Sequence, residues 1–144
     1  MTKRRPGVRR DEVLDRSVEI SSMKASVSRH ADARKGCEPR IETNPWLELR
    51  GFMDEPVRDV QVVVMSVHVD DRTVPGPARP AAVGAIVKTR PDLSVVVGFP
   101  QLEFDRVWLM ALLGHLKFAH LLFTRPHRNT ALVISLSFSS EMEE

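Results

Sequence analysis

The sequence has few of the features that mark secreted, membrane or disulfide-linked proteins. Its 144 residues include a single cysteine, Cys37, so no intramolecular disulfide can form, and a reducing compartment is favoured. No apolar run approaches the roughly 18 residues that a membrane-spanning helix needs. The charged start at Lys3, Arg4 and Arg5 is followed by acidic residues instead of the apolar core of a signal peptide. We therefore expect a cytoplasmic protein that contacts no membrane.

Sequence signatures of enzymes are also missing. The seven glycines are scattered and form no phosphate-binding loop, and neither a Gly-x-Ser-x-Gly motif nor a metal-binding cysteine pair is present. Five histidines occur, and no spacing among them indicates a metal site: His30, His68, His115, His120 and His127. If the protein were an enzyme, its chemistry would rest on His68, Asp70 and His127. The sequence instead predicts a non-enzymatic protein without a cofactor or a metal.

Charge and apolar residues are distributed unevenly. Residues 1–45 carry 11 Lys/Arg against 7 Asp/Glu, whereas residues 46–144 carry 10 against 12. The first segment has no aromatic residue and few large aliphatic ones, so it buries too little apolar surface to offset its chain entropy. We predict a poorly ordered basic N-terminal tail over residues 1–45 and a single β-rich domain over residues 46–144. Within the tail, residues 11–20 suit a short helix or a short strand.

Six segments of the predicted domain have strand patterns. Four of them precede residue 100, at 46–53, 60–69, 82–89 and 93–99, and the run of valines from Val60 to Val69 gives the strongest signal. Two more, at 116–124 and 131–139, form a predicted hairpin. In the last strand Leu136 and Phe138 alternate with serines, so we expect both to lie in the core.

One helix is predicted between these two groups of strands, over residues 101–113. Pro100 suits its start, and Gly114 suits a left-handed cap at its end. One helical face is apolar and comprises Phe104, Val107, Trp108, Ala111 and Leu112. The other side is apolar too, at Leu102, Leu109, Met110 and Leu113. Such a helix is either sandwiched inside the domain or meets a second copy of the chain, and we favour an interface at these last four residues.

The predicted order of elements is β-β-β-β-α-β-β, which indicates a mainly β fold of the α+β class. Turn signals every eight to twelve residues favour an antiparallel sandwich or a strongly curled sheet of about six strands, with the helix over one open end or on one face. A single sheet of four to six strands with the helix on one face is the alternative.

Two clusters of basic residues suggest contacts with anions. The turn at 125–130 places Arg125, His127 and Arg128 together, where they could contact an anion or an acidic partner, although a solvated hairpin tip explains them as well. A basic run that could contact nucleic acid stands in the predicted tail, at Lys3, Arg4, Arg5, Arg9 and Arg10. The acidic residues that follow and the lack of aromatic residues weaken the second suggestion.

These observations predict a small binding or assembly module that is not an enzyme. Excess apolar surface on the helix indicates self-association, with a homodimer as the simplest form. A nucleic-acid-associated regulatory protein, which would use the basic N-terminal arm, is the alternative. The sequence does not identify a protein partner.

Overall fold

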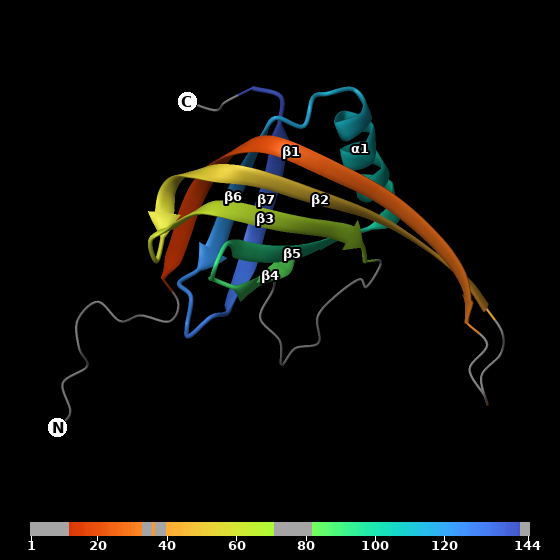
Figure 1. Ribbon diagram of the computed structural model, residues 1–144, viewed down its shortest axis with the longest axis horizontal. Coiled ribbons are helices and arrows are strands. Elements are labelled where there is room, and N and C mark those ends of the chain that lie inside the picture. Colours follow the sequence, from red (N-terminus) through yellow and green to blue (C-terminus); the bar gives the residue numbers. More distant parts are fainter. Residues whose placement is uncertain (1–11, 33–35, 37–39, 71–81, 142–144) are drawn as a thin grey trace.

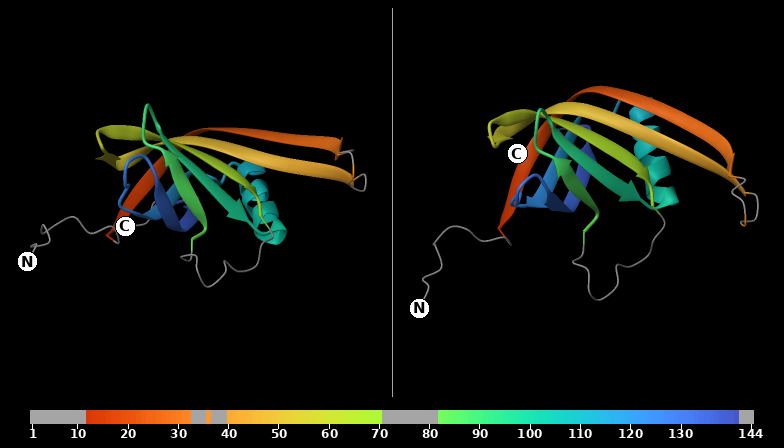
Figure 2. Two further views of the ribbon diagram at one scale, coloured as in Figure 1. Left: turned by 90° about the horizontal axis from the view of Figure 1, so that it is seen from below. Right: turned by 60° about the horizontal axis from the view of Figure 1, so that its bottom comes forward.

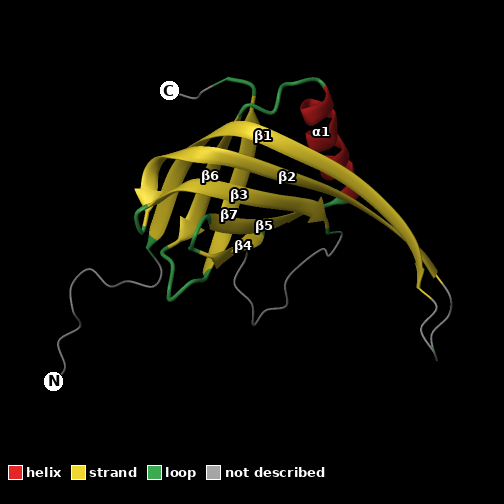
Figure 3. Ribbon diagram, viewed as in Figure 1, coloured by secondary structure: helices red, strands yellow, loops and turns green. Residues whose placement is uncertain are grey.

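Seven strands and one helix make up the computed structural model, which describes residues 12–32, 36, 40–70 and 82–141 (Figure 1). The strands before the helix are β1 (Val13–Asp32), β2 (Arg40–Val57), β3 (Val60–Val69), β4 (Gly84–Lys88) and β5 (Leu93–Phe99). The helix α1 (Gln101–Leu112) is followed by β6 (Phe118–Thr124) and β7 (Ala131–Ser139). Figure 3 shows how far strands predominate, so the prediction of a mainly β fold with one helix is confirmed.

The strands form a closed barrel in the order β1-β2-β3-β5-β4-β7-β6, and β6 pairs with β1. The expectation of a sandwich is therefore wrong, and the curled sheet that was the other expectation closes completely on itself, with seven strands instead of about six. The expected order is also wrong, because five strands precede the helix instead of four. In addition, β3 and β5 pair in parallel from Val63↔Leu93 to Val69↔Phe99, so the sheet is not purely antiparallel.

The strand missing from the prediction is β1, which lies in the segment that we expected to be a poorly ordered tail. It pairs with β6 from Val13↔Thr124 to Glu19↔Phe118, and this pairing closes the barrel. Val18 is buried in the core. The expectation of poor order over residues 1–45 is thus wrong for β1 and for the start of β2. A strand that buries one face needs an apolar residue at only every second position, so composition alone hides it.

The helix agrees with its prediction in both position and termination. It begins after Pro100 and ends at Leu112, and Gly114 has a φ of +72°, the left-handed conformation expected of a terminating glycine. The amide of Gly114 donates to the Ala111 carbonyl at 3.2 Å, and that of His115 donates to the Met110 carbonyl at 2.8 Å. These two bonds form a Schellman motif and satisfy carbonyls that the helix end would leave unpaired.

The core fills the barrel and is closed at one end by α1. Phe104 and Val107 are buried there, and Trp108 packs partly buried beside them. Leu136 and Phe138 lie at the edge of the core as partly buried residues, so their expected core position is confirmed only in part. The described part of the chain contains no helix that is both long enough and apolar enough to cross a membrane.

The hairpin of β1 and β2 extends beyond the barrel as a two-stranded ribbon (Figures 1 and 2). We call residues 22–32 and 40–45 the ribbon. Pairing of β2 with β3 begins at Trp46, and pairing of β1 with β6 ends at Glu19, so the ribbon has no third strand among the described residues. All three views show it passing the helix and continuing away from the barrel.

Candidate protein interface

The outer face of α1 exposes a row of leucines. Leu102, Leu109 and Leu113 are 62%, 54% and 61% exposed, which rules out the alternative that the helix is sandwiched inside the domain. Leu112 is 70% exposed, so the prediction that it packs on the buried face is wrong. Met110 is partly buried against the core, which makes it a poorer interface residue than predicted. The helix therefore offers a face centred on Leu102, Leu109 and Leu113.

The ribbon has an apolar face that continues the inner face of the barrel. Met23 lies opposite Leu49, and Ala25 lies opposite Leu47, and residues directly opposite each other share a face of the sheet. Leu47 and Leu49 are completely buried in the barrel. Further along the ribbon the same face carries the exposed residues Val27, Ala31 and Ile41 and the partly buried Pro45.

The opposite face of the ribbon is polar. It carries Ser22, Lys24, Ser26, Ser28, His30 and Asn44. A bulge between Ile20 and Ser22 sets this arrangement, because it moves the inward positions from even to odd residue numbers. Met23, Ala25 and Val27 alternate with polar neighbours in the sequence, which is a strand signal that the prediction of a poorly ordered tail did not include.

The helix and the base of the ribbon are neighbours in the molecule. In all three views α1 stands beside the ribbon where the ribbon leaves the barrel (Figures 1 and 2). We call the exposed apolar residues of both elements the ribbon–helix surface: Met23, Val27, Ile41, Leu102, Leu109, Leu112 and Leu113. Charges accompany it. Arg29 stands on the apolar face of the ribbon, and on α1 the exposed Arg106 stands among the leucines, with Glu103 and Asp105 to either side of them.

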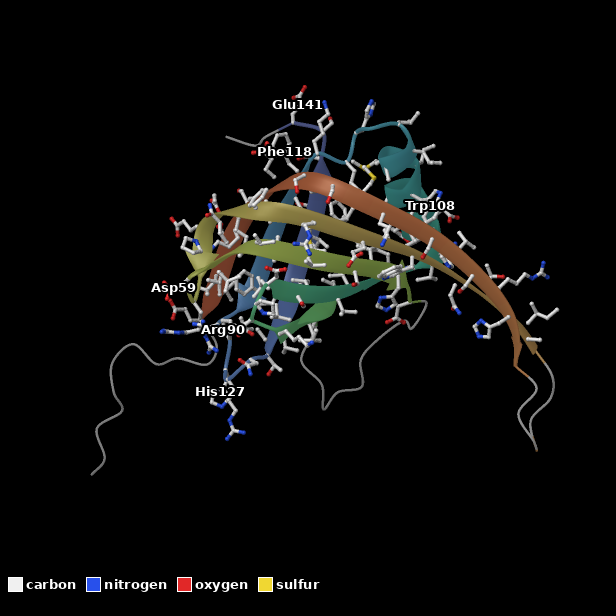
Figure 4. The ribbon with its side chains drawn as sticks, viewed as in Figure 1. Asp59, Arg90, Trp108, Phe118, His127 and Glu141 are labelled. Atoms are coloured by element: carbon white, nitrogen blue, oxygen red, sulfur yellow. The ribbon has the colours of Figure 1, made fainter. Side chains whose placement is uncertain are left out.

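The predicted anion-binding turn is tied to the rest of the barrel by hydrogen bonds. Arg125 Nη1 lies 3.1 Å from Glu12 Oε2. Arg58 donates from Nη2 to the Pro126 carbonyl at 2.7 Å and from Nη1 to the Arg128 carbonyl. His127 lies at the exposed tip of the turn (Figure 4). These contacts give the turn a structural role, and anion binding by Arg125, His127 and Arg128 stays a prediction.

The residues that would have carried an enzymatic reaction do not converge. His68 and Asp70 stand at the C-terminal end of β3, both beside Gly98 of β5, whereas His127 is at the β6–β7 turn at the lower edge of the barrel in Figure 4. Among the described residues, no group of three or more His, Cys, Asp or Glu side chains is placed to hold a metal ion. The basic residues Lys3, Arg4, Arg5, Arg9 and Arg10, and Cys37, lie outside the described residues.

The ribbon–helix surface thus holds seven of the twelve large hydrophobic residues that are exposed in the part of the chain that the structure describes. Comparison of the chain with protein-family models, with curated proteins and with solved structures returned no match.

Proposed function

We propose that this protein is a non-catalytic assembly module that forms a twofold-symmetric homodimer through the ribbon–helix surface. The observation that carries the proposal is the exposure of the apolar face of the ribbon, where Met23, Val27 and Ile41 are 40%, 59% and 64% exposed. These side chains continue a face that is buried in the barrel, but no other described strand or helix covers them.

An uncovered ribbon of this kind is costly in water. A two-stranded hairpin is marginally stable by itself, and a third strand or a packed helix is normally needed. Each square ångström of apolar surface removed from water contributes about 25 cal/mol, so a partner that covered the ribbon would stabilise both its fold and the complex. Apolar and polar residues alternate along the ribbon, which is typical of strands that bury one face and expose the other to solvent.

The outer face of α1 has the properties that this partner needs, which is why a second copy fits best. In a twofold dimer, the surface that one copy offers is the surface that the other copy offers in return. The ribbon of each copy can then pack on α1 of the other, and both contacts form at once.

The test compares the molar masses of two pairs of variants by light scattering coupled to size exclusion. The wild type is expected to elute as a dimer, and Leu109→Glu with Leu113→Glu is expected to elute as a folded monomer. Val27→Glu with Ile41→Glu should do the same, because it places charge on the other half of the contact. Ser26→Glu with Ser28→Glu adds equal charge to the polar face of the ribbon and should leave the dimer intact.

Two results would contradict the proposal. A wild type that is monomeric at about 100 μM has too weak an interface for a stable dimer, whose total buried area is normally at least 1,200 Å². A dimer that survives both pairs of glutamates uses another surface.

Nucleic-acid binding through the basic arm remains an alternative prediction. It concerns Lys3, Arg4, Arg5, Arg9 and Arg10. Five phosphate contacts would give a slope of about −4.5 in a plot of log affinity against log salt concentration for duplex DNA. Binding that shows this dependence and disappears on deletion of residues 1–11 would support the alternative, and no binding at low salt would remove it.

A further inference from the structure

A pocket of about 200 Å³ lies on the outer surface of the barrel, where β1 runs between β2 and β6. It is separate from the ribbon–helix surface and shares no residue with it. Side chains from three neighbouring strands contribute most of its lining: Phe52, Asp54, Ser17, Glu19, Phe118 and His120. Phe118 is seen at the upper edge of the barrel in Figure 4.

The register of the strands places a carboxylate between two aromatic rings. Glu19 of β1 lies directly opposite Phe52 of β2 on one side and directly opposite Phe118 of β6 on the other. Cross-strand neighbours of this kind have Cβ atoms about 5 Å apart on one face of the sheet. Phe52 is half exposed, so its ring is accessible from solvent.

The backbone beside this row is packed so closely that only glycine fits. Gly51 precedes Phe52, and a Cβ added to it would collide with the Glu19 carbonyl and with the Val18 side chain. The glycine therefore lets β1 and β2 approach each other at the point where Glu19 and Phe52 stand side by side. The arrangement belongs to the barrel itself, so the pocket is formed before any ligand enters.

Two other polar residues of the pocket, Asp54 and His120, are held in place by contacts within the barrel. Asp54 Oδ1 accepts hydrogen bonds from the amides of Ser17 and Glu55, both at 3.0 Å. His120 Nε2 lies 3.4 Å from Asp15 Oδ1, so the one basic side chain of the lining already faces a carboxylate. Glu19, by contrast, has no side-chain hydrogen bond or ion pair with any residue that the structure describes.

We propose that this pocket binds a small organic ammonium ion. A cation within about 6 Å of a ring centre is attracted by the face of an aromatic side chain, and two such rings flank the pocket. Glu19 supplies the opposite charge between them, and the charged residues of the lining are two carboxylates, Glu19 and Asp54, against His120 alone. A primary or quaternary ammonium group with a short apolar body matches this combination of charge, aromatic surface and volume.

The experiment titrates the full-length protein with choline and with 3,3-dimethyl-1-butanol, which has the same shape and no charge. Choline is expected to bind at a dissociation constant on the order of 1 mM, as suits so small a ligand, with the largest NMR shifts at Phe52 and Phe118. The neutral compound should bind at least about tenfold more weakly, since it loses both the ion pair and the cation–π contacts.

Variants assign the binding to the pocket. Glu19→Gln keeps the size of the side chain and should weaken choline binding about tenfold. Phe52→Leu combined with Phe118→Leu should remove it, and a thermal melt will show whether this pair still folds. Glu48→Gln removes a carboxylate from β2 outside the pocket and should change nothing.

Three outcomes would overturn the proposal. Equal affinity for choline and for the neutral compound would show that charge is not recognised. Choline binding that is unchanged in Glu19→Gln would place the cation elsewhere. If binding does not saturate at choline concentrations well above the expected dissociation constant, the pocket does not bind an organic ammonium ion. Because Glu19→Gln is a near-isosteric change on an exposed side chain, its result does not depend on how the double phenylalanine variant folds.

Discussion

The two ends of the β1–β2 hairpin have the same alternation of apolar and polar residues, but the apolar face is buried at one end and exposed at the other. At the barrel end Val18, Leu47 and Leu49 are at most 1% exposed, whereas on the ribbon Val27 and Ile41 are more than half exposed. The barrel end is flanked by β3 and β6, and the ribbon has no such neighbours among the described strands. Alternation thus determines which face is apolar, while the neighbouring elements decide whether that face is buried.

The end of the hairpin opposite the ribbon is additionally held by polar contacts. Arg16 Nε donates to the Glu55 carbonyl at 3.1 Å, which links β1 to the end of β2. Arg58, in the tight turn between β2 and β3, links that turn to the carbonyls of the β6–β7 turn. Arg58 and Asp59 both have positive φ values, 48° and 67°, as a two-residue type I′ hairpin turn requires. Both apolar packing and hydrogen bonds therefore join this end of the hairpin to the rest of the barrel.

The largest expected effect comes from removing the first strand altogether. Deletion of residues 1–44 takes away β1 and opens the barrel between β2 and β6, so we expect loss of cooperative unfolding in a circular dichroism melt. This reverses the expectation of a dispensable tail. Deletion of residues 1–11 is the control and should leave the melting transition in place. A truncated chain that still melts cooperatively would mean that the barrel can close without β1.

Substitutions at two residues that face each other across the hairpin compare the stability contributions of its buried and exposed parts. Leu49→Ala empties a completely buried position and should lower the free energy of unfolding by about 2–5 kcal/mol. Its cross-strand neighbour Met23 is 40% exposed, so Met23→Ala should cost less than about 1 kcal/mol. Urea unfolding of both variants at a protein concentration where the chain is monomeric makes the comparison. Equal costs would show that the ribbon face is covered within one chain.

The polar contacts at the barrel end predict a smaller loss. Arg58→Ala removes two hydrogen bonds from a charged donor to backbone carbonyls and should cost about 1–3 kcal/mol. Arg29→Ala on the ribbon serves as the matched arginine and should change the stability of the monomer by no more than about 0.5 kcal/mol. Chemical denaturation of the two variants measures the difference, and a larger effect at Arg29 would contradict this division of the hairpin.

The smallest effect on monomer stability should follow from shortening the ribbon. Replacing residues 27–45 by Asn-Gly joins the paired residues Ser26 and Trp46 through a two-residue turn that suits a hairpin. The barrel keeps all of its strands, so its unfolding free energy should stay within about 1 kcal/mol, while the dimer should be lost. Light scattering and a urea titration on the same sample separate these outcomes, and a dimer that persists would exclude the ribbon from the interface.

Local sequence patterns predicted most of the individual elements. Residues 60–69 and 93–99 form strands with the predicted limits, and the helix ends at Leu112, one residue before its predicted end and two residues before Gly114. The face of α1 that the sequence assigned to an interface is exposed at Leu102, Leu109 and Leu113. These features depend on residues close in the chain, whose spacing is directly visible in the sequence.

Strand β1 was not predicted from the sequence because apolar residues occupy only part of its inward-facing positions. Leu14, Val18 and Ile20 face inward, but Arg16 shares their side, and charged and polar residues occupy the positions between them. Averaged over the segment, this composition is similar to that of a disordered tail. The pocket at Glu19 was missed for a related reason, since Phe52 and Phe118 are 66 positions apart and only the strand register brings them to either side of Glu19.

The sequence by itself therefore determined that the elements after residue 45 are strands and one helix, and about where that helix ends. Only the tertiary structure decided that the strands close into a barrel, that β3 and β5 run in parallel, and that the hairpin continues past its neighbours as a ribbon. The physical reason is that hydrogen-bonding capacity along a strand is the same for every partner. Pairing is chosen by how all the apolar faces can be buried together, and that choice involves residues throughout the chain.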